Sequence, residues 1–172
     1  MKKRKSVYAL ALALTTLFAA GAPANVQAAG SHDMYRVYNP NSGEHFYTAY
    51  QRELYNLIGH GWQYEGVGWS APDEGWYVYR LYNPNAGDHH YTMDVNECNM
   101  LIDKGWKYEG VGWASPSLGW EDPKKAEGVP VYRLYNPYAA TATHHYIKNA
   151  DEANKLIDLG WKYEGIGWYA VR

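Results

Sequence analysis

The sequence predicts an α+β, β-rich fold in which three ββαβ repeats pack as one closed pseudo-threefold body, similar to a β-trefoil or a small propeller. The first observation behind this prediction is an internal repeat, because residues 35–69, 79–113 and 132–168 share one pattern over about 35 residues. The second is that a hairpin with one helix and one further strand is too small to bury its own apolar face in water. The three copies are therefore expected to pack against one another.

Aromatic side chains are expected to fill most of this interior. The chain contains 18 Tyr and 8 Trp but only 1 Cys, so no internal disulfide can stabilise it. Leu, Ile, Val and Phe are scarce, and such a composition alone would indicate disorder. Because each aromatic ring can bury roughly 150–250 Å², most rings must belong to the core.

The first 28 residues have the pattern of a secretory signal peptide. Basic residues at 2–5 precede an apolar stretch over 7–20, and small residues at 26–28 form a cleavage site. No later apolar run approaches the roughly 20 residues that a membrane span needs. The product is expected to be secreted and extracellular. Without a wall-sorting signal, any association with a cell wall would be non-covalent.

Residues 29–34 are expected to be a linker or a cloning remnant, and residues 35–172 a single three-repeat domain. Beyond the signal peptide, 12 Lys and Arg stand against 18 Asp and Glu, a formal charge of −6. Nucleic-acid binding draws its affinity from clusters of Lys and Arg. A nucleic-acid partner is therefore not expected.

Each copy begins with a predicted hairpin. In the second copy, residues 78–82 are β-branched and aromatic and end at the turn pair Asn83-Pro84, which is typical of a strand. Residues 85–88 then return the chain into a second short strand at 89–92. The corresponding loop of the third copy is two residues longer.

A helix is predicted after each hairpin. Asp94 with Glu97, and Asn149 with Glu152, have the spacing of a capping box, whereas the first copy has Tyr50 at the capping position. Apolar residues recur at i, i+3 and i+4, which places them on one buried helix face. They are Leu54, Leu57, Ile58, Cys98, Leu101, Ile102, Ala153, Leu156 and Ile157. The glycines expected to stop the helices are Gly61, Gly105 and Gly160.

An aromatic strand closes each copy, over residues 106–113 in the second. Glycines inside this strand predict a bulge or a close approach of two backbones. Each closing strand ends in a tryptophan.

Arginine, glutamate and histidine recur at fixed positions of the repeat. They are Arg36, Arg80, Arg133, Glu65, Glu109, Glu164, His45, His89 and His144. One carboxylate copied three times does not supply the two different carboxyl groups of a glycosidase. Because buried charges need partners, a structural polar network is expected. The least favoured alternative makes these glutamates, with a histidine, the acid or base of a cell-wall hydrolase.

Adjacent histidines at His89-His90 and His144-His145 invite a metal assignment. Neighbouring residues of a strand, however, point to opposite faces, and the first copy has Phe46 at the second position. Neither a metal site nor a cofactor is expected.

Tryptophans at strand ends and in the joins between copies are the expected ligand-binding residues. They are Trp69, Trp113, Trp168, Trp76 and Trp120. Flat rings beside acids and amides suit the apolar C–H faces and the hydroxyls of sugars, and element ends are where scaffolds place binding groups. The alternative is that the same rings form the core or the joints.

The repeated pattern resembles a tandem-repeat domain of uncharacterised function in secreted and surface proteins of Gram-positive bacteria. That family reads Tyr-Arg-Leu-Tyr-Asn-Pro-Asn-x-Gly, His-Phe-Tyr-Thr and Gly-Trp-x-Tyr-Glu-Gly, and residues 79–110 carry nearly all of it. The first copy differs mainly at Val37, and the third departs in its loop and has Ile147 for threonine. The resemblance implies an accessory role in attachment to a wall or glycan, and it supplies no catalytic residue.

The expected function is a secreted, non-catalytic module that binds a cell-wall or other glycan, including peptidoglycan, through surface aromatic residues. The alternative is a protein-interaction or structural module whose aromatic residues are all interior and which has no sugar site.

Overall fold

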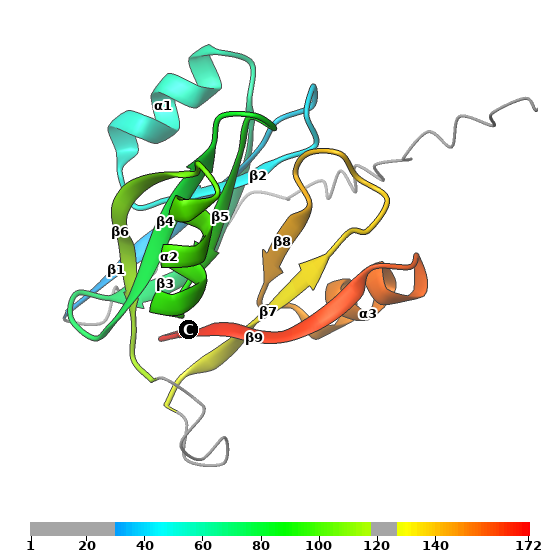
Figure 1. The fold of residues 1–172 in the computed structure, drawn as a ribbon. Helices are drawn as coiled ribbons and strands as arrows, with labels where there is room; N and C mark the ends of the chain where they lie inside the picture. The colour runs from blue at the N-terminus through cyan, green and yellow to red at the C-terminus, as the bar shows by residue number, and fades with distance from the viewer. Residues whose placement is uncertain (1–29, 118–126) are drawn as a thin grey trace, which may run out of the picture.

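The computed structural model describes residues 30–117 and 127–172, which form three similar units (Figure 1). The first unit contains β1 (Ser31–Tyr38), β2 (His45–Thr48), α1 (Gln51–Gly59) and β3 (Gln63–Pro72). The second contains β4 (Trp76–Asn83), β5 (Asp88–Thr92), α2 (Val95–Asp103) and β6 (Lys107–Ser115). The third contains β7 (Val129–Tyr135), β8 (His144–Ile147), α3 (Ala150–Asp158) and β9 (Lys162–Ala170). The predicted signal peptide, residues 1–28, lies outside the described residues.

Each unit is a three-stranded antiparallel sheet with its first strand in the middle, in the orders β2-β1-β3, β5-β4-β6 and β8-β7-β9. The predicted order of strand, strand, helix and strand is confirmed in every copy. Within the described part of the chain the three sheets remain separate ladders, so they do not close into a barrel. The fold is therefore β-rich, with three sheets and one helix beside each.

Residues 31–34, predicted to be part of a linker, form the first half of β1 instead. Ser31 is the register partner of Pro72 in β3. His32 Nδ1 lies 2.9 Å from Asp73 Oδ1, and the Asp73 N–H donates to the Gly30 carbonyl at 2.8 Å. The linker prediction is wrong because the middle strand of the unit continues past the repeated motif to pair with the far end of β3.

The hairpin turns are stabilised by one asparagine in each copy. The side-chain oxygens of Asn39, Asn83 and Asn136 accept hydrogen bonds from the backbone N–H two residues later, at 2.9, 3.0 and 3.0 Å. This is the Asx turn that asparagine forms with its own backbone. It explains why the pair Asn-Pro recurs where each first strand ends.

The predicted capping boxes form only in part. Asp94 Oδ1 accepts from the Asn96 N–H at 2.8 Å and Asn149 caps α3, whereas Tyr50 makes no side-chain cap. The second bond of the capping box, from the Asp94 backbone N–H to Glu97, does not form, because that N–H donates to Thr92 Oγ1 at 3.0 Å. The glutamate that was expected to accept it, Glu97, faces a neighbouring repeat.

The helices end where the glycines predict. Gly61, Gly105 and Gly160 each follow the C-cap residue with φ of +90°, +93° and +96°. This left-handed conformation is accessible to glycine at little cost.

A bulge interrupts each closing strand, as the internal glycines predict. In the second sheet the register shifts on both sides of the pair Arg80 and Gly110, and Gly110 has φ of +102°. Gly66 and Gly165 have the same conformation, with φ of +97° and +105°. The bulge changes the direction of the side chains that follow it in the strand.

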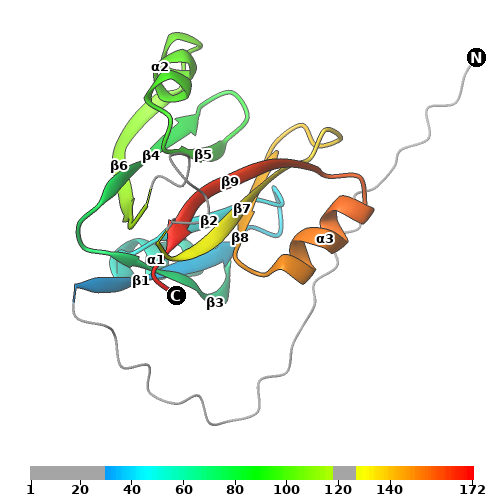
Figure 2. The ribbon, with the colours of Figure 1, turned by 90° about the horizontal axis from the view of Figure 1, so that it is seen from below.

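The core lies where the three closing strands meet. Rings of Trp69, Trp113 and Trp168 contact one another with centroids 5.4, 5.4 and 5.0 Å apart. One tyrosine from each second strand packs beside them, and these are Tyr47, Tyr91 and Tyr146. Because all three repeats contribute to this one cluster, they share an interior, and Figure 2 shows their sheets around a common centre with α2 and α3 on the outside.

Smaller clusters lie under the helices. Val37, Phe46 and Leu54 form one beneath α1, and Leu134 belongs to another beneath α3. Cys98 of α2 is buried and is not in a disulfide, as predicted for a small apolar position. None of the helices in residues 30–117 and 127–172 is long and apolar enough to span a membrane.

Candidate functional site

The closing tryptophans, which were predicted to contact a ligand, lie in the core. Trp69, Trp113 and Trp168 are 2, 4 and 1 % exposed, and none of their indole N–H groups has a hydrogen-bond acceptor among the described residues. Each ring follows the glycine bulge of its strand and packs against the other two rings. The prediction that these three rings form a binding surface is therefore wrong.

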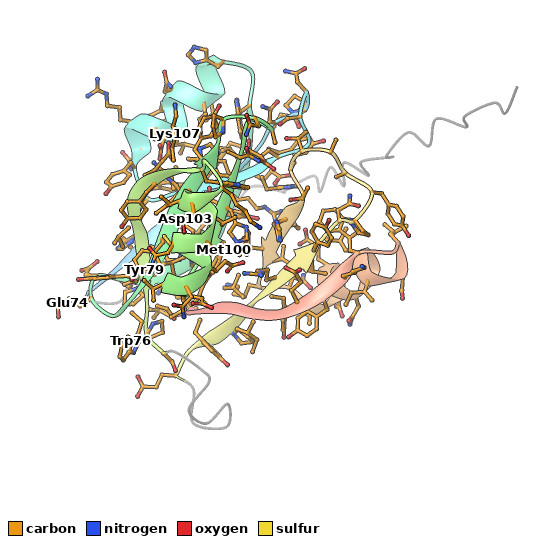
Figure 3. All side chains as sticks on the ribbon, viewed as in Figure 1. Glu74, Trp76, Tyr79, Met100, Asp103 and Lys107 are labelled. Atoms are coloured by element: carbon orange, nitrogen blue, oxygen red, sulfur yellow. The ribbon has the colours of Figure 1, made fainter. Side chains whose placement is uncertain are left out.

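Trp76 is the join tryptophan that the structure describes, and it is 52 % exposed at the start of β4 (Figure 3). Its register partner is Ser115, and the corresponding positions of the other sheets hold His32 and Val129. Trp76 is thus exposed but not repeated. Trp120 lies outside the described residues.

The repeated arginines, glutamates and histidines come together within each unit, as the sequence predicts. Arginine Nε lies 2.9 Å from a glutamate oxygen in the pairs Arg36–Glu65, Arg80–Glu109 and Arg133–Glu164. Histidine Nε2 lies 3.2–3.4 Å from the same glutamates in the pairs His45–Glu65, His89–Glu109 and His144–Glu164. Each glutamate is thus engaged by an arginine and a histidine at once.

A second set of glutamates, from the helices, joins neighbouring repeats and was missed from sequence. Glu53, Glu97 and Glu152 contact the arginine of the next repeat, in the pairs Arg80–Glu53 at 3.0 Å, Arg133–Glu97 at 2.8 Å and Arg36–Glu152 at 3.5 Å. The last of these joins the third repeat to the first. The sequence did indicate a second role for this glutamate. The first copy has Glu53 at the same position, although Tyr50 cannot form a capping box with it.

His89 differs from the equivalent histidines because it faces a buried carboxylate from the first repeat. Glu44 accepts from the His89 backbone N–H at 2.9 Å and from its Nδ1 at 2.7 Å. Burial alone lowers the pKa of His89, but hydrogen bonds to Glu109 and Glu44 raise it to about 9. This histidine is protonated at neutral pH.

His45 and His144 occupy the same position in the other copies and are neutral. Burial, with His145 close by, lowers the pKa of His45 well below its usual value, and the two rings are 4.0 Å apart. Burial and the neighbouring His90 lower the pKa of His144 to about 3, with the rings 4.5 Å apart. Equivalent positions therefore hold different charges because their neighbours differ.

The second histidine of each pair is a buried hydrogen-bonding residue. His90 Nδ1 lies 3.1 Å from the Tyr146 hydroxyl, and its Nε2 lies 3.2 Å from Glu97. The Tyr146 hydroxyl donates to the Tyr91 carbonyl at 3.0 Å, which links the third repeat to the second. Phe46, at the corresponding position, fills the same space without these bonds.

Across residues 30–117 and 127–172, no group of three or more His, Cys, Asp or Glu side chains is placed to hold a metal ion. The repeated carboxylates are held by arginines, and the central tyrosine hydroxyls are buried. These polar groups join and orient the repeats.

The aromatic residues that the structure does expose in every copy are tyrosines. Tyr64, Tyr108 and Tyr163, on the closing strands, are 48, 49 and 51 % exposed. Each contacts a tyrosine of the middle strand with ring centroids 6.2 Å apart, in the pairs Tyr35–Tyr64, Tyr79–Tyr108 and Tyr132–Tyr163. We call these the tyrosine pairs. Their spacing is the same in all three units.

The inner members of the first and third pairs are supported by their own units. Tyr35 packs on the cluster beneath α1 together with Leu57 and Trp62, and Tyr132 packs in the same way on the cluster beneath α3. An exposed aliphatic residue is the register partner of the inner tyrosine in each sheet. These residues are Val67, Val111 and Ile166. Each tyrosine pair is thus a partly apolar surface on a rigid sheet.

Sequence reasoning passed over these tyrosines because tyrosine is common throughout the chain. The signal that could have found them is the spacing in the closing strand, where Tyr and Trp lie five residues apart across the bulge in every copy. Residues five positions apart point to opposite faces of a regular strand, and the two register shifts that lie between these rings in each sheet preserve that difference.

An open groove of about 730 Å³ lies between α2 and the third sheet. Its lining includes Asp94, Glu97, Met100, Arg133, Glu164 and Ile166. Arg133 is paired with both Glu97 and Glu164, so the central charges of this groove satisfy one another.

A protein-family model described as a domain of unknown function, DUF5648, matches residues 33–171. No curated protein and no solved structure gives a significant match to the chain.

Proposed function

We propose a binding function for this chain, which belongs to the family of the domain of unknown function DUF5648. In this proposal the protein is a secreted, non-catalytic module that attaches to the glycan strands of a cell wall. The contact residues are the three tyrosine pairs, in place of the buried tryptophans.

The observation that carries the proposal is the repetition of the tyrosine pairs with a ring separation of 6.2 Å in all three units. An exposed tyrosine offers an apolar ring face and a hydroxyl that donates and accepts hydrogen bonds. A sugar ring presents the complementary combination of C–H groups and hydroxyls. Core packing does not account for the rings of Tyr64, Tyr108 and Tyr163, which are about half exposed.

Charge favours a neutral glycan over an anionic wall polymer. The chain beyond residue 28 has 12 Lys and Arg against 18 Asp and Glu. The arginines of the repeat are engaged by glutamates on two sides, as Arg133 is by Glu97 and Glu164. The three repeated arginines are therefore not available to bind phosphate or carboxylate groups.

The proposal includes a pseudo-threefold arrangement of the repeats, closer to a small propeller than to a barrel. Nearly equal separations within the tryptophan cluster support it, as do the arginine–glutamate contacts that run from repeat to repeat and return to the first. The three copies of one motif support a tandem-repeat origin for the domain. The motif resemblance supports a Gram-positive source and attachment to the wall or a glycan.

The experiment is a titration of the purified protein against Gram-positive sacculi and an array of neutral glycans. The triple variant Tyr64→Ala, Tyr108→Ala, Tyr163→Ala is expected to bind at least about tenfold more weakly, a change of about 1.4 kcal/mol. Tyr138→Ala is the matched control, because Tyr138 is 83 % exposed but lies in the unrepeated loop of the third copy. Its binding is expected to be unchanged.

Two outcomes would contradict the proposal. One is the absence of glycan binding by the unaltered protein. The other is equal binding by the triple variant and the Tyr138→Ala control, with both variants shown to be folded by circular dichroism.

A second candidate is contact with a partner protein through the start of β4. Trp76 is exposed there, and the corresponding positions of the other copies hold His32 and Val129. Exposed aromatic residues such as this one are enriched at protein interfaces. Loss of attachment to sacculi in Trp76→Ala, with binding retained in the tyrosine triple variant, would favour this candidate.

A further inference from the structure

The three tyrosine pairs are separate surfaces that belong to separate repeats. Tyr35 packs against the cluster beneath α1, and Tyr132 packs against the cluster beneath α3, each within its own repeat. The residues that link neighbouring repeats are different ones, namely the helix glutamates, the histidines and the central tyrosines. Both rings of each tyrosine pair therefore come from one repeat, and beside the third pair Ile166 also lines the groove next to α2.

The three pairs face different sides of the molecule. Closing strands converge at their tryptophan ends, so the parts of the sheets that carry the tyrosine pairs and helices extend away from the centre. Figures 1 and 2 show α1, α2 and α3 on separate sides. Tyr79 lies beside α2, far across the molecule from α3 in the view of Figure 3. The pairs are thus not aligned along one edge.

The repeats are also fixed relative to one another. The last strand is tied to the first repeat, because the Val171 N–H donates to the Ser70 carbonyl at 2.8 Å and the Ser70 N–H donates to the Arg172 carbonyl at 3.0 Å. The Tyr47 hydroxyl donates to the Tyr146 carbonyl at 2.8 Å across the same junction. These buried contacts prevent the sites from turning to face one strand.

We propose that the protein joins separate glycan strands, one at each tyrosine pair, and so acts as a cross-linker of the polymer. This inference rests on the proposed glycan-binding function. Three sites in line on one face would strengthen attachment to a single strand through effective concentration. Sites that face three directions on a rigid body favour occupation by different strands.

The test mixes two preparations of sacculi, each carrying a different fluorescent dye, and adds increasing amounts of protein. Mixed-colour aggregates are expected at intermediate protein concentration. The aggregates are expected to disperse when the protein is in large excess. Each binding position on a glycan strand then holds a separate protein molecule, and no molecule joins two strands. Bound protein, measured in the pellet of the same samples, is expected to rise steadily throughout.

The double variant Tyr64→Ala, Tyr108→Ala keeps only the third tyrosine pair. It is expected to bind sacculi but to form no mixed aggregates, while Tyr138→Ala aggregates them like the unaltered protein. Binding by the unaltered protein without mixed aggregates would overturn the cross-linking inference and leave the binding function intact. Aggregation by the double variant at the level of the unaltered protein would also overturn it. Absence of all binding would overturn both.

Discussion

The inner tryptophans and the outer tyrosines are aromatic residues of the same strands, yet they have opposite environments. On β9, Trp168 is 1 % exposed and Tyr163, five positions earlier, is 51 % exposed. Between them Gly165 adopts φ of +105° and the register with β7 shifts. The last three residues of β9 are all buried and its first three are all exposed. The difference teaches that the position of a ring along the strand, more than its residue type, decides whether it builds the core or remains available for binding.

The largest expected effect is the loss of an inner ring. Trp113→Ala is expected to lower the free energy of unfolding by about 3–5 kcal/mol, as removal of a buried large side chain does. Urea denaturation followed by circular dichroism measures this change. Trp76→Ala, which removes a half-exposed tryptophan, is the matched control and is expected to cost under about 1 kcal/mol. Equal losses in both variants would contradict the buried position of Trp113.

Acidification is expected to weaken the interior. His144 has a pKa of about 3 in the folded protein and about 6.5 when unfolded, so the unfolded state binds the proton first as the pH falls from 6.5 toward 3. Each unit of difference is worth about 1.4 kcal/mol. Urea midpoints measured across this range are expected to fall. In His144→Gln the decline is expected to be shallower, and an unchanged slope would contradict the neutral state of His144.

Alkaline conditions are expected to act through His89. Its pKa of about 9 in the folded protein lies above the unfolded value, so its contribution is fully present below about pH 6.5 and is lost as the pH rises through 9. Stability is therefore expected to fall between these values. Glu44→Gln removes the carboxylate at 2.7 Å and is expected to flatten that part of the curve. A curve unaltered by Glu44→Gln would contradict the role of this pair.

A smaller effect is expected from one inner hydroxyl. Tyr146→Phe keeps the ring but leaves the Tyr91 carbonyl and His90 Nδ1 without the partner that they have at 3.0 and 3.1 Å. A buried polar group without its partner costs about 1–3 kcal/mol, and urea denaturation measures the loss. Tyr146→Phe with full stability would show that these bonds contribute nothing.

The smallest expected effect on stability is at the outer rings. Tyr64→Ala is expected to change the free energy of unfolding by under about 1 kcal/mol, because half of its surface is already in water. A loss as large as that of Trp113→Ala would mean that the outer ring is part of the core. Retained stability allows the same variant to report on binding alone.

The sequence was informative about the repeat itself. Its strand, helix and turn order followed from local chemistry: the Asn-Pro turns, the cap residues Asp94 and Asn149, and the glycines after each helix all act on neighbouring backbone. The repeated arginines and glutamates also came together as expected. These features depend on contacts within one repeat, which a single copy of the motif encodes.

Contacts between repeats were harder to predict. The sequence placed Glu97 in a capping box, but the glutamate contacts Arg133 of the next repeat. The sequence also placed Trp69 on the surface. This ring is buried by contacts with Trp113 and Trp168, which lie far away in the chain, and the spacing around Trp69 does not reveal them. The pairing of His45 with His145 across the first and third repeats has the same origin. Spacing within one copy carries no information on which copies meet.

The outer tyrosines are expected to contact the glycan, and the inner tryptophans are expected to make no contact with it. Nuclear magnetic resonance of protein with ¹³C-labelled tyrosine and ¹⁵N-labelled tryptophan, titrated with soluble peptidoglycan fragments, follows both sets of rings in one sample. The ring signals of Tyr64, Tyr108 and Tyr163 are expected to shift, while the indole N–H signals of Trp69, Trp113 and Trp168 stay in place. Shifts of these indole signals with unmoved tyrosine signals would contradict the account.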